Sequence, residues 1–268
     1  MVNNLESTAR EGRTGVARRF IGGMGYLGRG LRMWITSPRL MLLGAVPALI
    51  VGAVYTTGIV VFAVNLDAVA AWITPFAGAW TEPARVAVRF AAGAALVGAV
   101  LLLAVFTFVA VTLFVGDPFY ERIWRAVEAN LGDQPSEMDE PFWRSLLRGL
   151  GGAIRLLALT LLVGLTLFAS GFIPIVGQTV VPVLGVVLGG WILTLELTGY
   201  AFDARRLSLR QRRRMLGTRR ASTLGFGMLS YLLFLVPFGA VLIMPAAVAG
   251  ATMLSREALA ASPTRPVG

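Results

Sequence analysis

Arginine is the residue type in this chain with the most chemical potential. All 24 basic residues are arginines, and the sequence contains no histidine, lysine or cysteine. Their absence excludes the usual imidazole general base, thiolate nucleophiles and metal ligands, lysine Schiff bases and a phosphate-loop lysine. Guanidinium groups remain, and they bind oxyanions through paired N–H donors. We therefore expect anion binding without covalent catalysis, and no metal or cofactor.

Two groups of arginines are candidates for anion binding. In the first, Arg32 closes a glycine-rich stretch and Arg39 follows Ser37-Pro38 at the start of an apolar segment. Such a helix start suits an oxyanion, although a headgroup-layer helix with snorkelling arginines is the alternative. The second group is the eight arginines between Arg205 and Arg220, which either bind anions or anionic lipid or keep a loop in the cytoplasm. No nucleic-acid motif accompanies them, so we expect no nucleic-acid partner.

A third set of candidates lies in or beside the apolar windows. Glu196 adjoins one window, where an ionisable group either takes part in function or lies near the interface beside an arginine. Prolines and a glycine interrupt two windows, and such broken helices either line a substrate path or simply turn the chain. These interrupting residues are Pro174, Gly177, Pro182, Pro237 and Pro245.

Apolar windows dominate the 268 residues and predict an integral membrane protein. The chain is 56% apolar and 14% charged, with a mean hydropathy of +0.75, which excludes a freely soluble enzyme. Four windows carry no charge: residues 40–66, 90–116, 156–195 and 221–255. The first two are 27 residues each, which suffices for one transmembrane helix.

The last two windows predict helical hairpins, at residues 156–200 and 221–255. They contain 40 and 35 uncharged residues, whereas two crossings and a turn need about 43. We expect both hairpins to be re-entrant, with tips inside the bilayer; ordinary short hairpins that reach the far interface are the alternative. The predicted fold class is all-α: two long transmembrane helices, two hemi-penetrating hairpins and amphipathic interfacial helices.

Arginine placement predicts the orientation of the chain. The four segments outside the windows that share one side hold 22 of the 24 arginines; they are residues 1–39, 117–155, 203–220 and 256–268. By the positive-inside rule, we expect both termini to be cytoplasmic. We expect one membrane domain over residues 1–255, with a disordered start at 1–15 and a disordered tail at 256–268.

Two cytoplasmic segments have the apolar spacing of interfacial helices. One stripe runs from Phe20 to Trp34. Another runs from Phe119 to Leu131, with Asp117-Pro118 as its expected first turn and an acidic loop at 133–141 after it.

Five stretches of the sequence resemble the CysZ sulfate-permease family, which includes the etoposide-induced membrane proteins of eukaryotes. They are Asp117–Glu128, Phe172–Leu184, Trp191–Asp203, Leu224–Gly227 and Met244–Thr252. The resemblance implies a bacterial inner-membrane protein with two long spans and two hemi-penetrating hairpins. It also implies oligomers, and sulfate uptake for cysteine biosynthesis without ATP hydrolysis.

One motif of that family differs here. Sulfate-permease members carry paired arginines before the first long span, in a Pro-Gly-Leu-Arg-Arg motif nine residues ahead of a proline. Pro38 and Pro47 keep the spacing, but Arg39-Leu40-Met41-Leu42 occupies the motif, so Arg39 substitutes for one charge at most. The family's Gln-Tyr-x-Asp run is likewise replaced, by Glu196-Leu-Thr-Gly199. The resemblance implies an anion site at Arg39 and Leu40, with Arg32 close in sequence.

Two hypotheses follow. The first is a permease for a small oxyanion, sulfate for preference, working as a homo-oligomer among anionic lipids. The second is a non-transporting scaffold that binds partners or anionic lipid through its arginine-rich loops.

Overall fold

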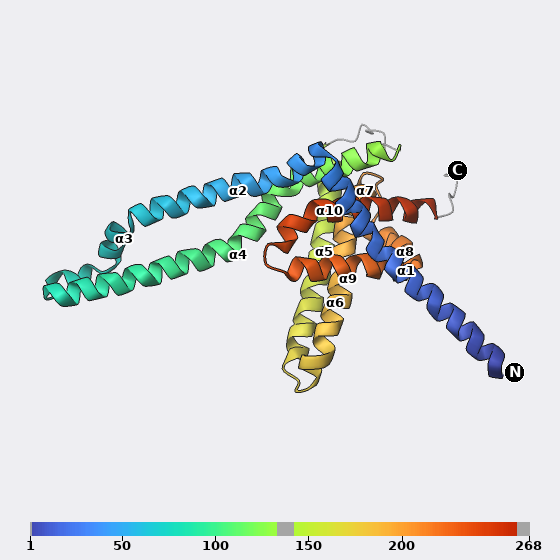
Figure 1. The fold of residues 1–268 in the computed structure, drawn as a ribbon, viewed down its shortest axis with the longest axis horizontal. Helices are drawn as coiled ribbons and strands as arrows, with labels where there is room; N and C mark the ends of the chain where they lie inside the picture. Colours follow the sequence, from blue (N-terminus) through green and yellow to red (C-terminus); the bar gives the residue numbers. More distant parts are fainter. Residues whose placement is uncertain (1, 133–141, 262–268) are drawn as a thin grey trace. The chain divides into compact units, whose positions relative to one another are not determined.

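The computed structural model describes residues 2–132 and 142–261, and in these residues every regular element is a helix (Figure 1). Within these ranges the side chains are described as well, except those of residues 2–14, 142–150 and 153. The predicted all-α class is therefore confirmed. The helices are α1 (Val2–Thr36), α2 (Pro38–Val64), α3 (Leu66–Ile73), the 3-10 helix η1 (Pro75–Ala79), α4 (Glu82–Asn130), α5 (Phe142–Gly171), α6 (Val176–Leu197), α7 (Gly199–Asp203), α8 (Leu209–Thr218), α9 (Arg220–Leu235) and α10 (Gly239–Ala260).

Residues 45–118 form one compact unit, which contains most of α2, then α3, η1 and most of α4. The hydroxyl groups of Tyr55 and Thr107 lie 2.7 Å apart and join the two long helices. The Tyr55 ring also meets Phe108 edge to face at 5.6 Å. Apolar side chains cover the outer surfaces, as expected of helices that face lipid. Both α2 and α4 are long and apolar enough to cross a membrane, as predicted.

Helix α4 does not restart at Asp117-Pro118, so the predicted N-cap there is wrong. Pro118 lies inside a continuous 49-residue helix. A proline removes one helical hydrogen bond, and long membrane helices tolerate this loss. Beyond Pro118 the helix buries one face, on which Tyr120, Ile123 and Val127 are almost fully covered. This burial favours continuing the helix over ending it.

Residues 1–44 and 119–268 form the second unit, and α1, α9 and α10 pack closely in it. Small residues allow this packing. A methyl group added at Gly23 would overlap the carbonyl of Ser222 on α9, and one added at Gly30 would overlap that of Ala246 on α10. The inner face of α1 is thus covered by protein. Its placement in the headgroup layer stays a prediction.

Both predicted breaks in the hairpins fall between helices. Residues 172–175 connect α5 to α6, and Ile175 has φ 69°. Residues 236–238 connect α9 to α10, and Phe238 has φ 61°. The two turns lie apart from each other (Figure 1).

The two helices of the first hairpin, α5 and α6, are longer than the charge-free window indicated. The apolar part of α5, Ile154–Gly171, has 18 residues and α6 has 22, so each arm is about 27–33 Å long and can reach across the hydrocarbon core. The charge-free window, residues 156–195, is shorter than the hairpin because Arg155 and Glu196 lie within its two arms. In the second hairpin α9 has only 16 residues, about 24 Å.

The two hairpins contact each other where α6 meets α9. Gly190 on α6 lies against the backbone of Gly227 and Met228 on α9. Gly189 is likewise covered by the ring of Tyr231. The close approach of the Gly190 and Gly227 backbones needs glycine at both of these positions, since a methyl group on either residue would overlap the other helix.

The ends of the helices differ from the expected bounds. Helix α1 begins at Val2, and α10 continues to Ala260, five residues past the expected boundary at 255. Glu257 supports this last turn through an ion pair with Arg219. The acidic loop at 133–141 and the tail at 262–268 lie outside the described residues.

Candidate functional site

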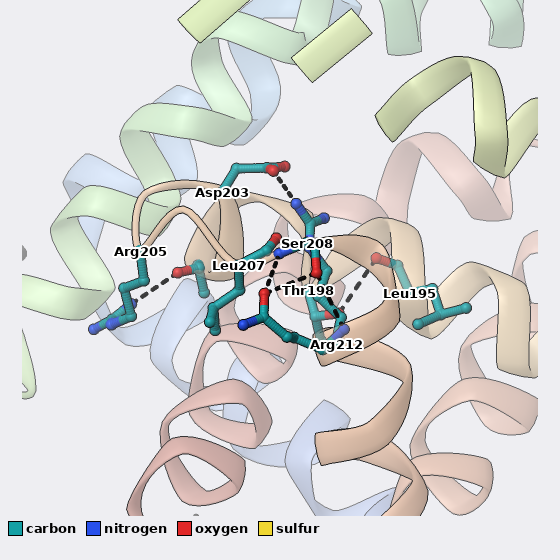
Figure 2. A network of polar contacts seen from close by, with 9 residues as sticks. Leu195, Thr198, Asp203, Arg205, Leu207, Ser208 and Arg212 are labelled. Carbon is teal, nitrogen blue, oxygen red and sulfur yellow. Dashed lines mark hydrogen bonds and ion pairs between the residues drawn. The ribbon is translucent and has the colours of Figure 1, made fainter. Parts of the chain in front are cut away.

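A polar network surrounds the turn between α6 and α8 (Figure 2). Ser208 is the N-cap of α8 and forms a capping box: the backbone N–H of Gln211 donates to the Ser208 hydroxyl, and the backbone N–H of Ser208 donates to the side-chain Oε1 of Gln211 at 2.8 Å. At the junction of α6 and α7, the Thr198 hydroxyl donates to the Thr194 carbonyl at 2.6 Å. The polar side chains thus fix the direction in which α8 leaves the turn.

Arg212 is the most deeply buried arginine among those described by the structure, with 8% of its surface exposed. Its Nε donates to the Leu207 carbonyl at 3.1 Å, and its guanidinium forms an ion pair with Asp203 (Figure 2). Burial lowers the pKa of Arg212 to about 10, so the group still carries its charge at neutral pH. Arg212 therefore secures α8 to the turn and is not available to a ligand.

Glu128 lies buried between two arginines from distant parts of the chain. Its carboxylate accepts two hydrogen bonds from Arg205, at 3.0 and 3.2 Å, and Arg256 Nη1 lies 3.7 Å away. Arg205 also donates to the Ala201 carbonyl at 2.9 Å. This bidentate geometry is the one in which a guanidinium binds an oxyanion. It joins α4, the turn after α7 and α10.

Glu128 was not among the residues predicted from the sequence, although the sequence contains a signal for it. Glu128 follows Trp124 by four residues and Val127 by one, on the face of α4 that is buried. An acid on an otherwise apolar helix face requires a cation opposite it. That partner, Arg205, is 77 residues away in sequence.

A second carboxylate, Glu257, joins α1 to the ends of α8 and α10. Arg219 Nη1 lies 2.7 Å from it and Arg29 Nη2 lies 4.0 Å from it. The Arg29 guanidinium also lies 4.3 Å from the centre of the Tyr26 ring. Burial, and then a hydrogen bond to Glu257, raise the pKa of Tyr26 to about 12.

The residues predicted to bind the anion lie around the start of α2. Arg32 and Arg39 are exposed, and Leu40 is buried. The Leu40 carbonyl accepts a hydrogen bond from Trp34 Nε1 at 2.9 Å. Gly44, one turn later, fits against Trp34 and Pro245. The predicted anion segment and one predicted pathway residue, Pro245, are therefore brought together.

The remaining pathway candidates are not gathered into one site. Pro174 and Pro237 are exposed in the two separate turns. Gly177 packs against the Gly171 carbonyl and closes its turn. Pro182 and Glu196 are exposed at different places along α6.

The arginine cluster 205–220 divides into two kinds of residue. Arg205, Arg212 and Arg219 each hold a carboxylate. The exposed members are Arg206, Arg210, Arg213, Arg214 and Arg220.

Comparison with known proteins places this architecture in a family. Residues 26–245 match the family described as sulfate transporter CysZ/etoposide-induced protein 2.4. The chain belongs to this family. The predicted resemblance is thereby confirmed. The matched range includes the α5–α6 hairpin, α9 with the first turns of α10, Glu128 and the arginine cluster.

One relative is the sulfate transporter CysZ of Pectobacterium atrosepticum. The two chains are 32% identical over 157 residues, which is 58% of this chain and 57% of that relative. The aligned part thus spans little more than half of the relative's length.

Proposed function

We propose that this CysZ-family protein is a permease that admits sulfate, or a closely related small oxyanion, through a bacterial inner membrane. The observation that carries the proposal is the family match over residues 26–245, together with the similarity to a protein named as a sulfate transporter. Within the part of the chain that the structure describes, five helices are long and apolar enough to cross a membrane, and they support the proposal. The imported sulfate would serve cysteine biosynthesis, and the protein itself would catalyse no reaction.

The proposed topology has both termini in the cytoplasm and two re-entrant hairpins. The short α9 supports this topology for α9–α10, because 16 residues fall short of a hydrocarbon core of about 30 Å. For α5–α6 the support is weaker, since its arms have full crossing length. The polar network at the ends of α8 and α10 would then lie on the cytoplasmic side, with 22 of the 24 arginines.

The proposed anion site is the first turn of α2. Pro38 has no N–H, so the N–H groups of Arg39 and Leu40 are among the first donors of the helix. The positive end of the helix dipole and the exposed guanidinium of Arg39 both favour a dianion there. Arg32 adds a second charge on the preceding helix. We also propose that the protein acts as a homo-oligomer.

Sulfate uptake by proteoliposomes tests the function. Vesicles with the purified full-length protein should take up radiolabelled sulfate faster than empty vesicles. Equal uptake by the two would refute transport and favour a non-transporting scaffold.

The variant Arg39→Ala tests the site. We expect slower uptake for it than for the wild type. The matched control is Arg85→Ala, which removes an arginine from a surface pair with Glu82, in the other compact unit. The control should transport at the wild-type rate, and an equal loss in both variants would contradict the assignment of Arg39.

A further inference from the structure

Helix α8 has two faces with different chemistry. The inner face carries Leu216, which is fully buried, and Arg212, which is held by Leu207 and Asp203. The outer face carries Arg210, Arg213 and Arg214, all exposed. The sequence of α8 from Leu209 to Thr218 contains no acid. Three positive charges therefore share one side of a short helix.

The outer face is fixed in direction. The capping box at Ser208 sets the first turn of α8, and Arg212 holds the middle. At the other end, the Thr223 hydroxyl of α9 donates to the Leu216 carbonyl at 3.0 Å. The helix cannot rotate its outer arginines toward the protein without breaking these contacts.

The outer arginines differ from their neighbours in their ion pairs. Within residues 15–132 and 154–261, the structure gives Arg210, Arg213 and Arg214 no ion pair. Their neighbours Arg205 and Arg219, in contrast, each bind a glutamate. The arginine-rich run thus contains arginines that pair with glutamates and, on the outer face of α8, three exposed arginines.

We propose that this outer face of α8 binds the phosphate groups of anionic lipids. Helix α9, which is apolar, begins at Arg220, two residues after α8 ends, so the cationic face lies next to a segment that enters the membrane. A guanidinium pairs with a phosphate through two parallel hydrogen bonds. Basic residues at a membrane surface strengthen anionic-lipid binding by roughly fivefold each, or about a hundredfold for three. The proposal rests on the membrane placement proposed above.

The test uses the full chain in nanodiscs. Because the chain contains no cysteine, Thr218→Cys supplies a single labelling site. Thr218 is exposed and follows Arg210 and Arg214 on the same row of the helix. A donor dye there reports energy transfer to acceptor-labelled phosphatidylglycerol or, separately, to acceptor-labelled phosphatidylcholine.

We expect stronger transfer to phosphatidylglycerol, and loss of the preference in the variant R210Q/R213Q/R214Q. The control R18Q/R19Q/R122Q removes three other exposed arginines and should keep the preference. Equal transfer to both lipids in the wild type would overturn the proposal. Loss of the preference in the control variant would also overturn the proposal, because the attraction would then depend on arginines outside α8.

Sulfate as a competitor separates a lipid site from a substrate site. Sodium sulfate and sodium chloride at equal ionic strength should weaken the lipid preference equally, since screening is the shared cause. A larger effect of sulfate would overturn the proposal and assign the face to the substrate. Uptake assays on the same protein separate the two proposals, since lipid preference without sulfate uptake refutes only transport, and uptake without lipid preference refutes only the lipid site.

Discussion

Replacement of Glu128 by alanine should destabilise the protein more than replacement of either arginine beside it. The Glu128 side chain is 1% exposed and accepts both hydrogen bonds of a bidentate pair with Arg205. Arg256 lies 3.7 Å from the same carboxylate. Loss of the carboxylate removes the buried anion that both guanidinium groups contact.

The size of the effect follows from this geometry. Removal of one partner of a buried ion pair costs about 3–5 kcal/mol. Glu128→Ala should lie at the upper end, because both guanidinium groups lose their contact with the same buried carboxylate. Arg205→Ala should cost less, since Arg256 still neutralises the glutamate. Arg256→Ala should cost least, since the bidentate pair survives.

Unfolding in mixed micelles of dodecyl maltoside and sodium dodecyl sulfate measures these differences. Tryptophan fluorescence is a suitable signal because Trp124, one turn before Glu128, is buried. The double variant E128A/R205A should cost less than the sum of its two single changes. The reasoning would be refuted if Glu128→Ala cost less than about 1 kcal/mol, or if Arg256→Ala cost as much as Glu128→Ala.

Three further predictions concern the contact between the hairpins, the tip of the α9–α10 hairpin and the turn after α4. Gly227→Leu should prevent the contact between the hairpins and yield aggregated protein, whereas Gly58→Leu, with open space around it, should elute like the wild type in size-exclusion chromatography. A re-entrant α9–α10 tip predicts that an impermeant maleimide applied outside the cell labels Trp72→Cys but not Phe238→Cys; equal labelling would contradict it. Gly132, at φ 81°, should cost about 1 kcal/mol when replaced by alanine, measured by unfolding in mixed micelles, and an unchanged stability would show that the positive φ is not required.

The apolar windows and the breaks inside them could be predicted from sequence because each depends on residues close together in the chain. Charge-free runs of 27 residues leave few alternatives to α2 and α4. The Gly171–Gly177 and Pro237–Gly239 clusters both interrupt helices. The prediction at Pro118 was wrong because a proline either starts a helix or lies within a long one, and only the packing of the residues that follow it decides between the two.

The ion pairs of the polar network could not be predicted in the same way. Sequence spacing says nothing about which of 24 identical arginines meets Glu128. Helical spacing does hold one unused signal: Arg212 lies three residues after Leu209 and four before Leu216, which places it on the inner face of α8. The same spacing places Arg210 and Arg214 outward.

Helix length alone does not identify the helices that face lipid. Helix α10 has 22 residues, enough to cross, yet 72% of its most apolar window is buried by the protein, compared with none in α4. Its surface is covered by α1 and α9, through Gly30 and Gly250 among others. A helix covered in this way needs no lipid to bury its apolar side chains, and its 16-residue partner α9 is too short to cross beside it. Burial and length together therefore favour a hemi-penetrating α9–α10 pair, while the exposed arms of α5–α6 fit a full crossing equally well.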